Sequence, residues 1–309
     1  MVLWQRVLAA ALGAGLFAVA SSAPVPAAEP NPARTEFSST KVAENLWMLT
    51  GSGGNIGAFA CDEGVALVDD DVAEMADKLK EAVANLSSKP VRYVINTHWH
   101  PDHVGGNESL RKAGAAIIAH HGTRRAMTVR HRVEALRQDL PPSPAGALPE
   151  VTFEEAITLH FGGEELRVFR TLPAHTGGDV IVYFRKANVY HAGDNFQTAG
   201  YPFVDFSTGG NINGMIVVAE QLRKHADAAA KLIPGHGPVG TKADVEEYLD
   251  MLVAIRDRVR ALIRKGKTAD EVVATKPSRE FDERWGKAFL TGDQFVRLVY
   301  QSLTARSRQ

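Results

Sequence analysis

Short apolar segments separated by glycine- and proline-containing breaks make up most of the chain. The segments NLWMLTG and NIGAFACDEGVALVDD lie on either side of the glycine cluster at 51–54 and alternate or run apolar in short bursts. This pattern predicts antiparallel strands joined by a flexible hairpin tip. Further segments of the same kind predict more strands; they are VRYVIN, AAIIAH, AITLHF, LRVFRTL, DVIVYF and NVYHAGD.

Other segments repeat apolar residues at the spacing of a helix. The apolar face between residues 72 and 86 predicts one such helix. Asp71 precedes it, and Glu74 follows three residues later, which is the spacing of a capping box at a helix start. Near the other end of the chain, Thr268 and Glu271 form a second box of this kind.

Each half of the chain contributes strands and then helices, and most strands are adjacent in sequence. This order predicts an α/β (α+β) fold in which two mixed sheets pack face to face and helices cover the outside. We expect a main domain at residues 29–240. Residues 241–309 should form a C-terminal helical extension that packs on the core.

The first 28 residues differ from the rest. Arg6 precedes the 14-residue apolar run VLAAALGAGLFAVA, and small residues and prolines follow it. This order is that of a secretory signal peptide, and the run is shorter than the ~20 residues that a membrane span needs. We therefore expect an exported protein without a membrane span in its mature form, which would be periplasmic in a Gram-negative source.

Composition excludes several other classes. The chain of 309 residues is 45% hydrophobic and carries a net charge of -1, without a long basic run. We therefore expect a small-molecule substrate and no nucleic-acid partner. The single Cys61 allows no intramolecular disulfide, and we interpret it as a small buried hydrophobe. The sequence leaves the oligomeric state open.

The stretch NTHWHPDHVGG at 96–106 concentrates metal-ligand residue types directly after an apolar strand. In an extended chain, His98 and His100 point to the same side and can reach one cation together. Asp102 and His103 follow Pro101 and can face a second position. Imidazole nitrogens and carboxylate oxygens suit zinc, with iron or manganese as alternatives. This density favours a metal site over a set of exposed loop histidines.

Three more candidate ligands lie in similar settings. His175 in LPAHTGGDV, Asp194 in YHAGDN and His236 in IPGHGP each lie next to a predicted strand and a turn. Each signal alone is weak. Together they fit residues that gather on one rim of a sandwich.

The motifs THWHPDH, PAHTGG, GDN and PGHG occur in that order, and between about Lys41 and Gly240 the chain resembles the metallo-β-lactamase-fold hydrolases. The resemblance implies a four-layer αββα sandwich that holds two Zn²⁺ ions. It also implies that Asp69 orients a histidine ligand, although Asp69 also suits a plain turn. The implied ligands are His98, His100 and His175 for the first metal, Asp102, His103 and His236 for the second, and Asp194 as the bridge.

Such a ligand set points to hydrolysis. Three histidines leave a vacant tetrahedral position on the first metal. Two cations ~3.5–4 Å apart can share a water and lower its pKa toward ~7, and the bridging hydroxide attacks a carbonyl. Asp102 could relay a proton to the leaving atom. No serine elbow of the G-x-S-x-G type is present.

The loops around the metal site determine the substrate, and they carry several conflicting signals. Metallo-β-lactamases with two zincs often have cysteine where this chain has Asp194, and lysine where it has Gln197. An aspartate bridge instead resembles glyoxalase II-like thioesterases and lactonases. Export favours a cyclic amide or ester, with β-lactams first, because glutathione thioesters are cytoplasmic. A one-iron persulfide dioxygenase is a further alternative, and a non-catalytic binding module is the least favoured.

Three residues are candidates for substrate binding. Asn55 ends the glycine-rich tip, which could close over a substrate or be an ordinary flexible turn. Tyr201 and Asn211 follow Asp194 and could line a pocket or pack within a loop. We also single out His191 as a histidine that could support the metal site, since it lies three residues before Asp194.

Overall fold

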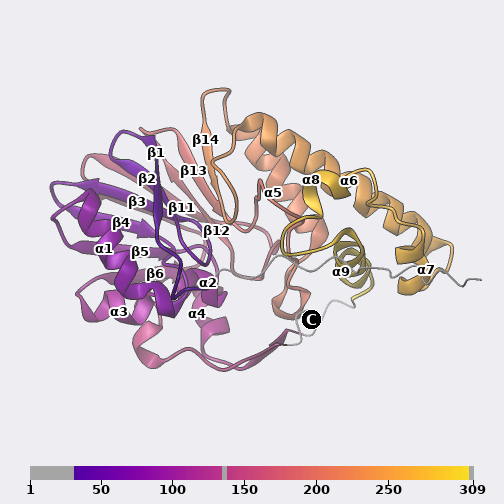
Figure 1. Ribbon diagram of the computed structural model, residues 1–309, viewed down its shortest axis with the longest axis horizontal. Coiled ribbons are helices and arrows are strands. Elements are labelled where there is room, and N and C mark those ends of the chain that lie inside the picture. The colour runs from indigo at the N-terminus through magenta and orange to yellow at the C-terminus, as the bar shows by residue number, and fades with distance from the viewer. Residues whose placement is uncertain (1–30, 134–137, 306–309) are drawn as a thin grey trace, which may run out of the picture.

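The computed structural model describes residues 31–133 and 138–305 (Figure 1). Two large mixed sheets lie face to face, and helices cover both outer faces. The predicted α/β sandwich is therefore confirmed. The signal peptide expected at residues 1–28 lies outside the described residues.

The first sheet has the strand order β1-β2-β3-β4-β5-β6-β9. Its first four strands are antiparallel neighbours joined by short turns, and the later strands pair in parallel across helical crossovers. The strands are β1 (Ser38–Ala43), β2 (Leu46–Thr50), β3 (Ile56–Cys61), β4 (Gly64–Val68), β5 (Val91–Asn96), β6 (Ala116–His120) and β9 (Val151–Phe153).

The second sheet has the order β10-β11-β12-β13-β14 and is antiparallel except for its last pair. A separate small hairpin pairs β7 (His131–Val133) with β8 (Gln138–Leu140). The strands of the second sheet are β10 (Ala156–Phe161), β11 (Glu164–Arg170), β12 (Val180–Phe184), β13 (Val189–Gly193) and β14 (Lys231–Pro234).

Helices form the two outer layers. Those from the first half of the chain lie beside the first sheet, and those from the second half lie beside the second sheet (Figure 1). None in the described ranges is long and apolar enough to cross a membrane. The helices are α1 (Ala76–Leu86), α2 (Pro101–Val104), α3 (Asn107–Lys112), α4 (His121–Met127), α5 (Ile212–His225), α6 (Lys242–Arg264), α7 (Ala269–Ala274), α8 (Asp282–Trp285) and α9 (Gly292–Thr304).

Three apolar clusters separate these layers. The cluster between the sheets contains Phe59 of one sheet and Phe184 of the other, at a ring distance of 6.2 Å. A second cluster lies under α1, and the third joins α5, α6 and α9 into one continuous core. Because central strands are covered on both faces, they read as apolar runs in the sequence.

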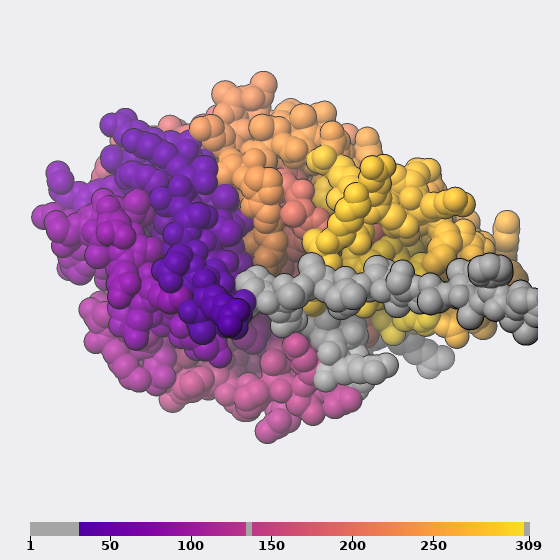
Figure 2. Space-filling model, in the orientation of Figure 1, coloured from indigo at the N-terminus to yellow at the C-terminus, as the bar shows by residue number. Residues whose placement is uncertain are grey.

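The C-terminal helices share that third core with residues near the strand ends, such as Trp99 and Val104. In the space-filling view they occupy the end of the molecule opposite to the first sheet (Figure 2). The extension expected from residue 241 onward is thus packed against α5.

The capping box predicted for Asp71 and Glu74 is wrong. Helix α1 begins at Ala76, after a short 3-10 turn, and no side chain caps either start. Asp71 has a left-handed φ of 63°. Its carboxylate accepts hydrogen bonds from the backbone N–H groups of Ser52 and Gly53, at 3.1 and 2.8 Å. It therefore fixes the glycine-rich tip, which the sequence predicted to be flexible.

His191 of β13 is fully buried between the sheets. Its Nε2 lies 3.2 Å from the carbonyl oxygen of Asn55, and the backbone N–H of Gly193 points to its Nδ1 at 3.4 Å. These contacts suit a neutral ring that donates from Nε2 and accepts at Nδ1. Burial lowers the pKa of His191 to about 4.

This buried ring makes folding sensitive to acid. Unfolded His191 has a pKa near 6.5 against about 4 in the fold, so the unfolded state binds the proton first as the pH falls. We expect metal-free protein to lose about 3 kcal/mol of unfolding free energy from this residue between pH 6.5 and 4. Urea unfolding across that range measures it. His191→Gln keeps a donor without titrating, and an equal pH slope in this variant would contradict the assignment.

Candidate metal centre

The predicted ligands follow or precede strand ends that meet at one edge of the sandwich. The stretch after β5 carries His98 and His100, and α2 carries Asp102 and His103, with Pro101 at the first helical position. β5 belongs to the first sheet and β13 and β14 to the second, and the packing of the two sheets brings these residues beside the loops that follow β13 and β14. The structure brings seven side chains together. His98, His100 and His175 form a first group, and Asp102, His103 and His236 form a second. The set of His98, His103 and Asp194 overlaps both groups and connects them.

The first group consists of three buried histidines. Nδ1 of His100 lies 3.1 Å from Nε2 of His98 and 2.8 Å from Nε2 of His175. Two nitrogens bound to one tetrahedral zinc at ~2.0–2.1 Å would be about 3.3 Å apart. The three ring nitrogens are therefore spaced as ligands of a single cation.

The second group is held together by carboxylates. Oδ2 of Asp102 lies 3.4 Å from Nε2 of His103 and 3.3 Å from Nε2 of His236. Oδ1 of Asp194 lies 3.2 and 3.6 Å from the same two nitrogens. Its other oxygen, Oδ2, lies 3.5 Å from Nε2 of His175 in the first group. Asp194 thus faces both groups, one oxygen to each.

Two buried polar atoms of this cluster lack a hydrogen bond, namely Nε2 of His103 and Oδ1 of Asp194. Buried polar groups are normally paired, and an unpaired one costs about 1–3 kcal/mol. Both atoms point into the second group. A cation there would satisfy them together, so the residues present fit a pair of metal ions.

Protonation of the histidines supports the same fit. Burial lowers the pKa of His98 well below its usual range, and lowers that of His175 too, so both rings are neutral and offer lone pairs. Burial opposes charge on His103 and His236 as well, but the two carboxylates of the cluster outweigh it and raise both pKa values. A divalent cation would displace those two protons.

Most of these histidines also have a hydrogen-bond partner at the ring nitrogen that points away from the cluster, as metal-binding histidines usually do. Nδ1 of His103 lies 2.8 Å from Oδ2 of Asp69, which is the contact that the resemblance implied for Asp69. The same carboxylate accepts from the backbone N–H and the hydroxyl of Thr97, both at 2.7 Å. Nδ1 of His175 donates to the carbonyl oxygen of Phe203 at 2.7 Å.

Sequence reasoning missed Asp205, whose Oδ2 lies 3.2 Å from Nε2 of His100. Burial alone would raise the pKa of Asp205, but His100, Ser207 and Thr208 bond to its carboxylate and lower it. The residue starts a 3-10 turn 105 positions after His100, and no local pattern marks it.

Two residues predicted to bind substrate have other contacts. Tyr201 is 1% exposed, its hydroxyl lies 2.9 Å from Oδ1 of Asp282, and its ring stacks on Phe295. It therefore packs against the C-terminal helices. Asn211 is the N-cap of α5, where its side chain accepts from the N–H of Asn213. These contacts give Tyr201 a packing role and Asn211 a capping role, and substrate binding by either residue stays a prediction.

The cluster is open to solvent on one side. The side chains of Asp102 and His236 are each 35% exposed, whereas those of His103 and Asp194 are nearly inaccessible. The glycine-rich tip lies beside this opening, where the N–H of Gly54 donates to the carbonyl of Asp102 at 2.9 Å. A substrate therefore reaches the cluster from the Asp102 and His236 side.

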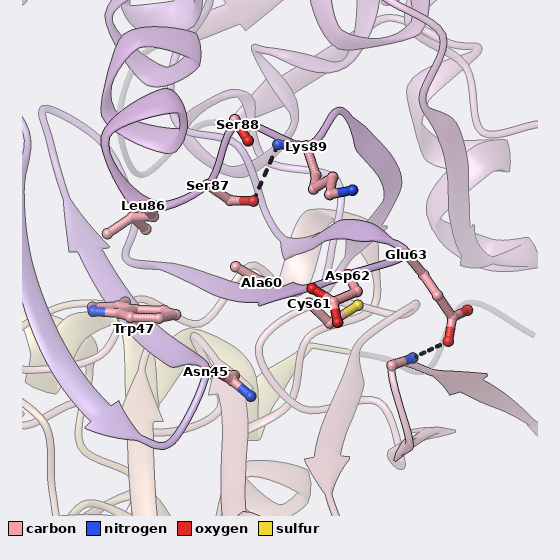
Figure 3. A pocket seen from close by; sticks show the side chains of 11 residues that line it. Asn45, Trp47, Ala60, Cys61, Asp62, Glu63, Leu86, Ser87, Ser88 and Lys89 are labelled. Atoms are coloured by element: carbon pink, nitrogen blue, oxygen red, sulfur yellow. Dashed lines mark hydrogen bonds between the residues drawn. The ribbon is translucent and has the colours of Figure 1, made fainter.

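A surface cavity of about 560 Å³ lies elsewhere (Figure 3). Cys61, Glu63 and Lys89 are among its lining residues, and it contains no residue of the cluster. It lies at the starts of β4 and β5, whereas the cluster lies at their ends. Cys61 is half-buried and its thiol points to the carbonyl of Gly64 at 3.4 Å.

Fold and cluster together define a candidate metalloprotein, and comparison with known proteins gives its family and supports a metal-dependent hydrolase. A sequence model of the Metallo-beta-lactamase superfamily matches residues 62–273. The chain therefore belongs to this superfamily. The matched range continues past the ligands into α7, within the helical extension.

Individual relatives are diverse. A metallo-beta-lactamase type 2 from Bacillus cereus is 26% identical over 227 residues, which cover 70% of this chain and 82% of that protein. A linear primary-alkylsulfatase from Pseudomonas sp. is 26% identical over 68% of this chain and 47% of its own length. The solved structure of a stereoselective inverting sec-alkylsulfatase from Pseudomonas sp. matches with a TM-score of 0.65 at 19% identity, over 87% of this chain and 50% of that one. The chain spans about half the length of these alkylsulfatases.

Substitution of Asp205 tests whether its contact with His100 contributes to metal binding. Asp205→Asn keeps the shape of the side chain but removes the charge that polarises His100, so zinc affinity should fall ~10–100-fold. Competition with a chromophoric chelator measures this. Asp227→Asn, at an exposed aspartate bonded to Asn188, is the matched control and should bind zinc as the unmodified chain does. Equal affinity in both variants would exclude a role for Asp205.

Proposed function

We propose that this chain is a binuclear zinc-dependent hydrolase that cleaves a carbonyl substrate. One observation supports this above all: Asp194 faces two ligand groups at once, with Oδ2 toward His175 and Oδ1 toward His103 and His236. Such an arrangement serves two cations better than one. The identity of the metal as zinc rests on the nitrogen-rich ligand set.

The residues of the cluster would have different roles in such a reaction. Two bound zinc ions would supply Lewis acidity and an activated water near neutral pH. His98, His100 and His175 would hold one ion with a position left open toward the substrate. Partial burial disfavours charge on Asp102, but His103 and His236 keep its pKa well below the usual range. Asp102 is therefore ionised and partly exposed, and we assign it the relay of a proton to the leaving atom, in which its low pKa makes it a weak base.

We propose β-lactams as the first substrate class, with cyclic esters beside them. The support is the similarity to the Bacillus cereus metallo-beta-lactamase type 2 over most of its length. The expected export also places the enzyme where envelope solutes are met.

A second candidate is an ester or thioester that is bound without a cationic side chain at the position of Gln197. Gln197 supports it, because this residue is buried and its amide lies 3.5 Å from Oδ2 of Asp194. A neutral amide in that position gives no positive charge to an anionic substrate group. The aspartate bridge points the same way, toward thioesterases and lactonases. The alkylsulfatase relatives add sulfate esters to the compounds worth testing.

A substrate panel on zinc-loaded protein distinguishes these classes. We expect about two zinc ions per chain and turnover of nitrocefin and a carbapenem, lost on treatment with a chelator. An acyl-homoserine lactone, S-lactoylglutathione and a linear primary alkyl sulfate form the other arms. His100→Ala removes a ligand and should lower kcat/KM by at least ~10³-fold. His225→Ala, at an exposed helical histidine, is the matched control.

The other outcomes are equally decisive. Turnover of the lactone or the thioester without either β-lactam would establish the second candidate. Turnover of the alkyl sulfate alone would replace the carbonyl substrate by a sulfate ester. One iron per chain with no hydrolysis would replace the hydrolase by a redox enzyme of the same fold.

Export is also part of the proposal. Expressed in a Gram-negative host, the chain should be recovered from the periplasm with a new N-terminus at Ala28 or Glu29, as expected from the small residues before these positions. Cell fractionation and intact mass measurement test this. A full-length product confined to the cytoplasm would contradict it.

A further inference from the structure

Asn55 connects the first sheet to the loop that carries His236. Its side-chain amide donates two hydrogen bonds, to the carbonyls of Pro234 at 3.0 Å and of Gly237 at 2.8 Å. Its backbone N–H donates to the carbonyl of Gly235 at 2.8 Å. Three bonds from one residue thus reach both flanks of His236, about 180 positions away in the chain.

The orientation of this amide is itself fixed. The hydroxyl of Thr50 donates to Oδ1 of Asn55 at 2.8 Å, and Asn55 is only 1% exposed. Both amide donors are therefore used within the protein. This corrects the prediction that Asn55 binds substrate, because no N–H group is left to offer.

His236 needs such support more than the other histidines do. In the described part of the chain, four histidines have a polar partner at the ring nitrogen that points away from the cluster; they are His98, His100, His103 and His175. No such contact appears for His236 there. Its ring is 35% exposed, so its position depends on the backbone of its loop.

We propose that Asn55 is a positioning residue for His236 and so for the second metal position. It acts through the backbone at 234–237 and touches neither metal nor substrate. Thr198 supports the loop from the other side, since its N–H and hydroxyl bond to the carbonyls of His236 and Pro238 at 3.3 and 2.7 Å. The inference rests on the two-metal site proposed above.

Zinc titration of the full chain tests the proposal directly. In Asn55→Ala the loop loses both side-chain bonds, and in Asn55→Asp an oxygen faces carbonyl oxygens in place of an N–H group. Both variants should bind a first zinc as the unmodified chain does and a second zinc at least ~10-fold more weakly. Two zinc ions bound with unchanged affinity in both folded variants would overturn the proposal.

A second measurement does not depend on metal. In metal-free protein, amide hydrogen exchange in a peptide covering 231–240 should be ~10-fold or more faster in Asn55→Ala than in the unmodified chain. Unchanged exchange there would overturn the proposal. If the unmodified chain binds fewer than two zinc ions, the proposed function fails, and this exchange result alone decides on Asn55.

Two further variants separate positioning from general loss of stability. Leu79→Ala removes packing under α1 on the far face of the first sheet and should leave both the second zinc and exchange at 231–240 unchanged. Thr50→Val removes only the hydroxyl that orients the amide and should shift both readouts in the same direction by a smaller factor. If Asn55→Ala does not fold, Thr50→Val and Asn55→Asp carry the test, and no shift in either would exclude the role.

Discussion

The packing of two carboxylates, one buried and one partly exposed, among five imidazoles at one edge of the sandwich is the constraint on which the rest of this structure depends. Ionised groups in a low-dielectric interior are costly unless opposite charges compensate them closely. In the metal-free chain the carboxylates raise the pKa of His103 and of His236, which favours the positively charged rings that compensate them. Metal ions would compensate the same carboxylates with divalent charge. The polar atoms that lack hydrogen bonds in the metal-free cluster therefore favour metal binding.

Such a cluster holds its geometry only if the backbone around it cannot relax. Strands covered on both faces supply that rigidity, and glycines supply the space. At Gly235 a Cβ would lie 1.8 Å from Oδ1 of Asp194, and at Gly54 one would lie 2.1 Å from the ring of His103. Any other residue at these positions would have to displace a ligand. The glycine-rich tip therefore packs closely against the site and is held by hydrogen bonds to Asp71. The sequence pattern alone had suggested a mobile hairpin.

Features whose residues lie close together in the sequence could be predicted, and contacts between residues far apart in the sequence could not. The stretch after β5 is recognisable because four ligands lie within six residues, and their types and spacing carry the chemistry. Strands such as β5 and β13 were predicted because burial on both faces leaves an apolar run. Asp205 and Asn55 were missed in their actual roles because their partners lie 105 and about 180 positions away. Asp71 was misassigned because an aspartate before a helix also suits a cap, and only the fold places the glycine loop against it.

The same reasoning explains why the family is clear and the substrate is not. The seven clustered side chains place no limit on the rest of a compound whose reactive bond can enter at the open side next to Asp102 and His236. Selectivity must come from other groups. Gln197 is buried, its amide nitrogen lies 3.5 Å from Oδ2 of Asp194, and it adds no positive charge that would favour an anionic substrate. Affinity for an anionic group would then have to come from the metal ions themselves.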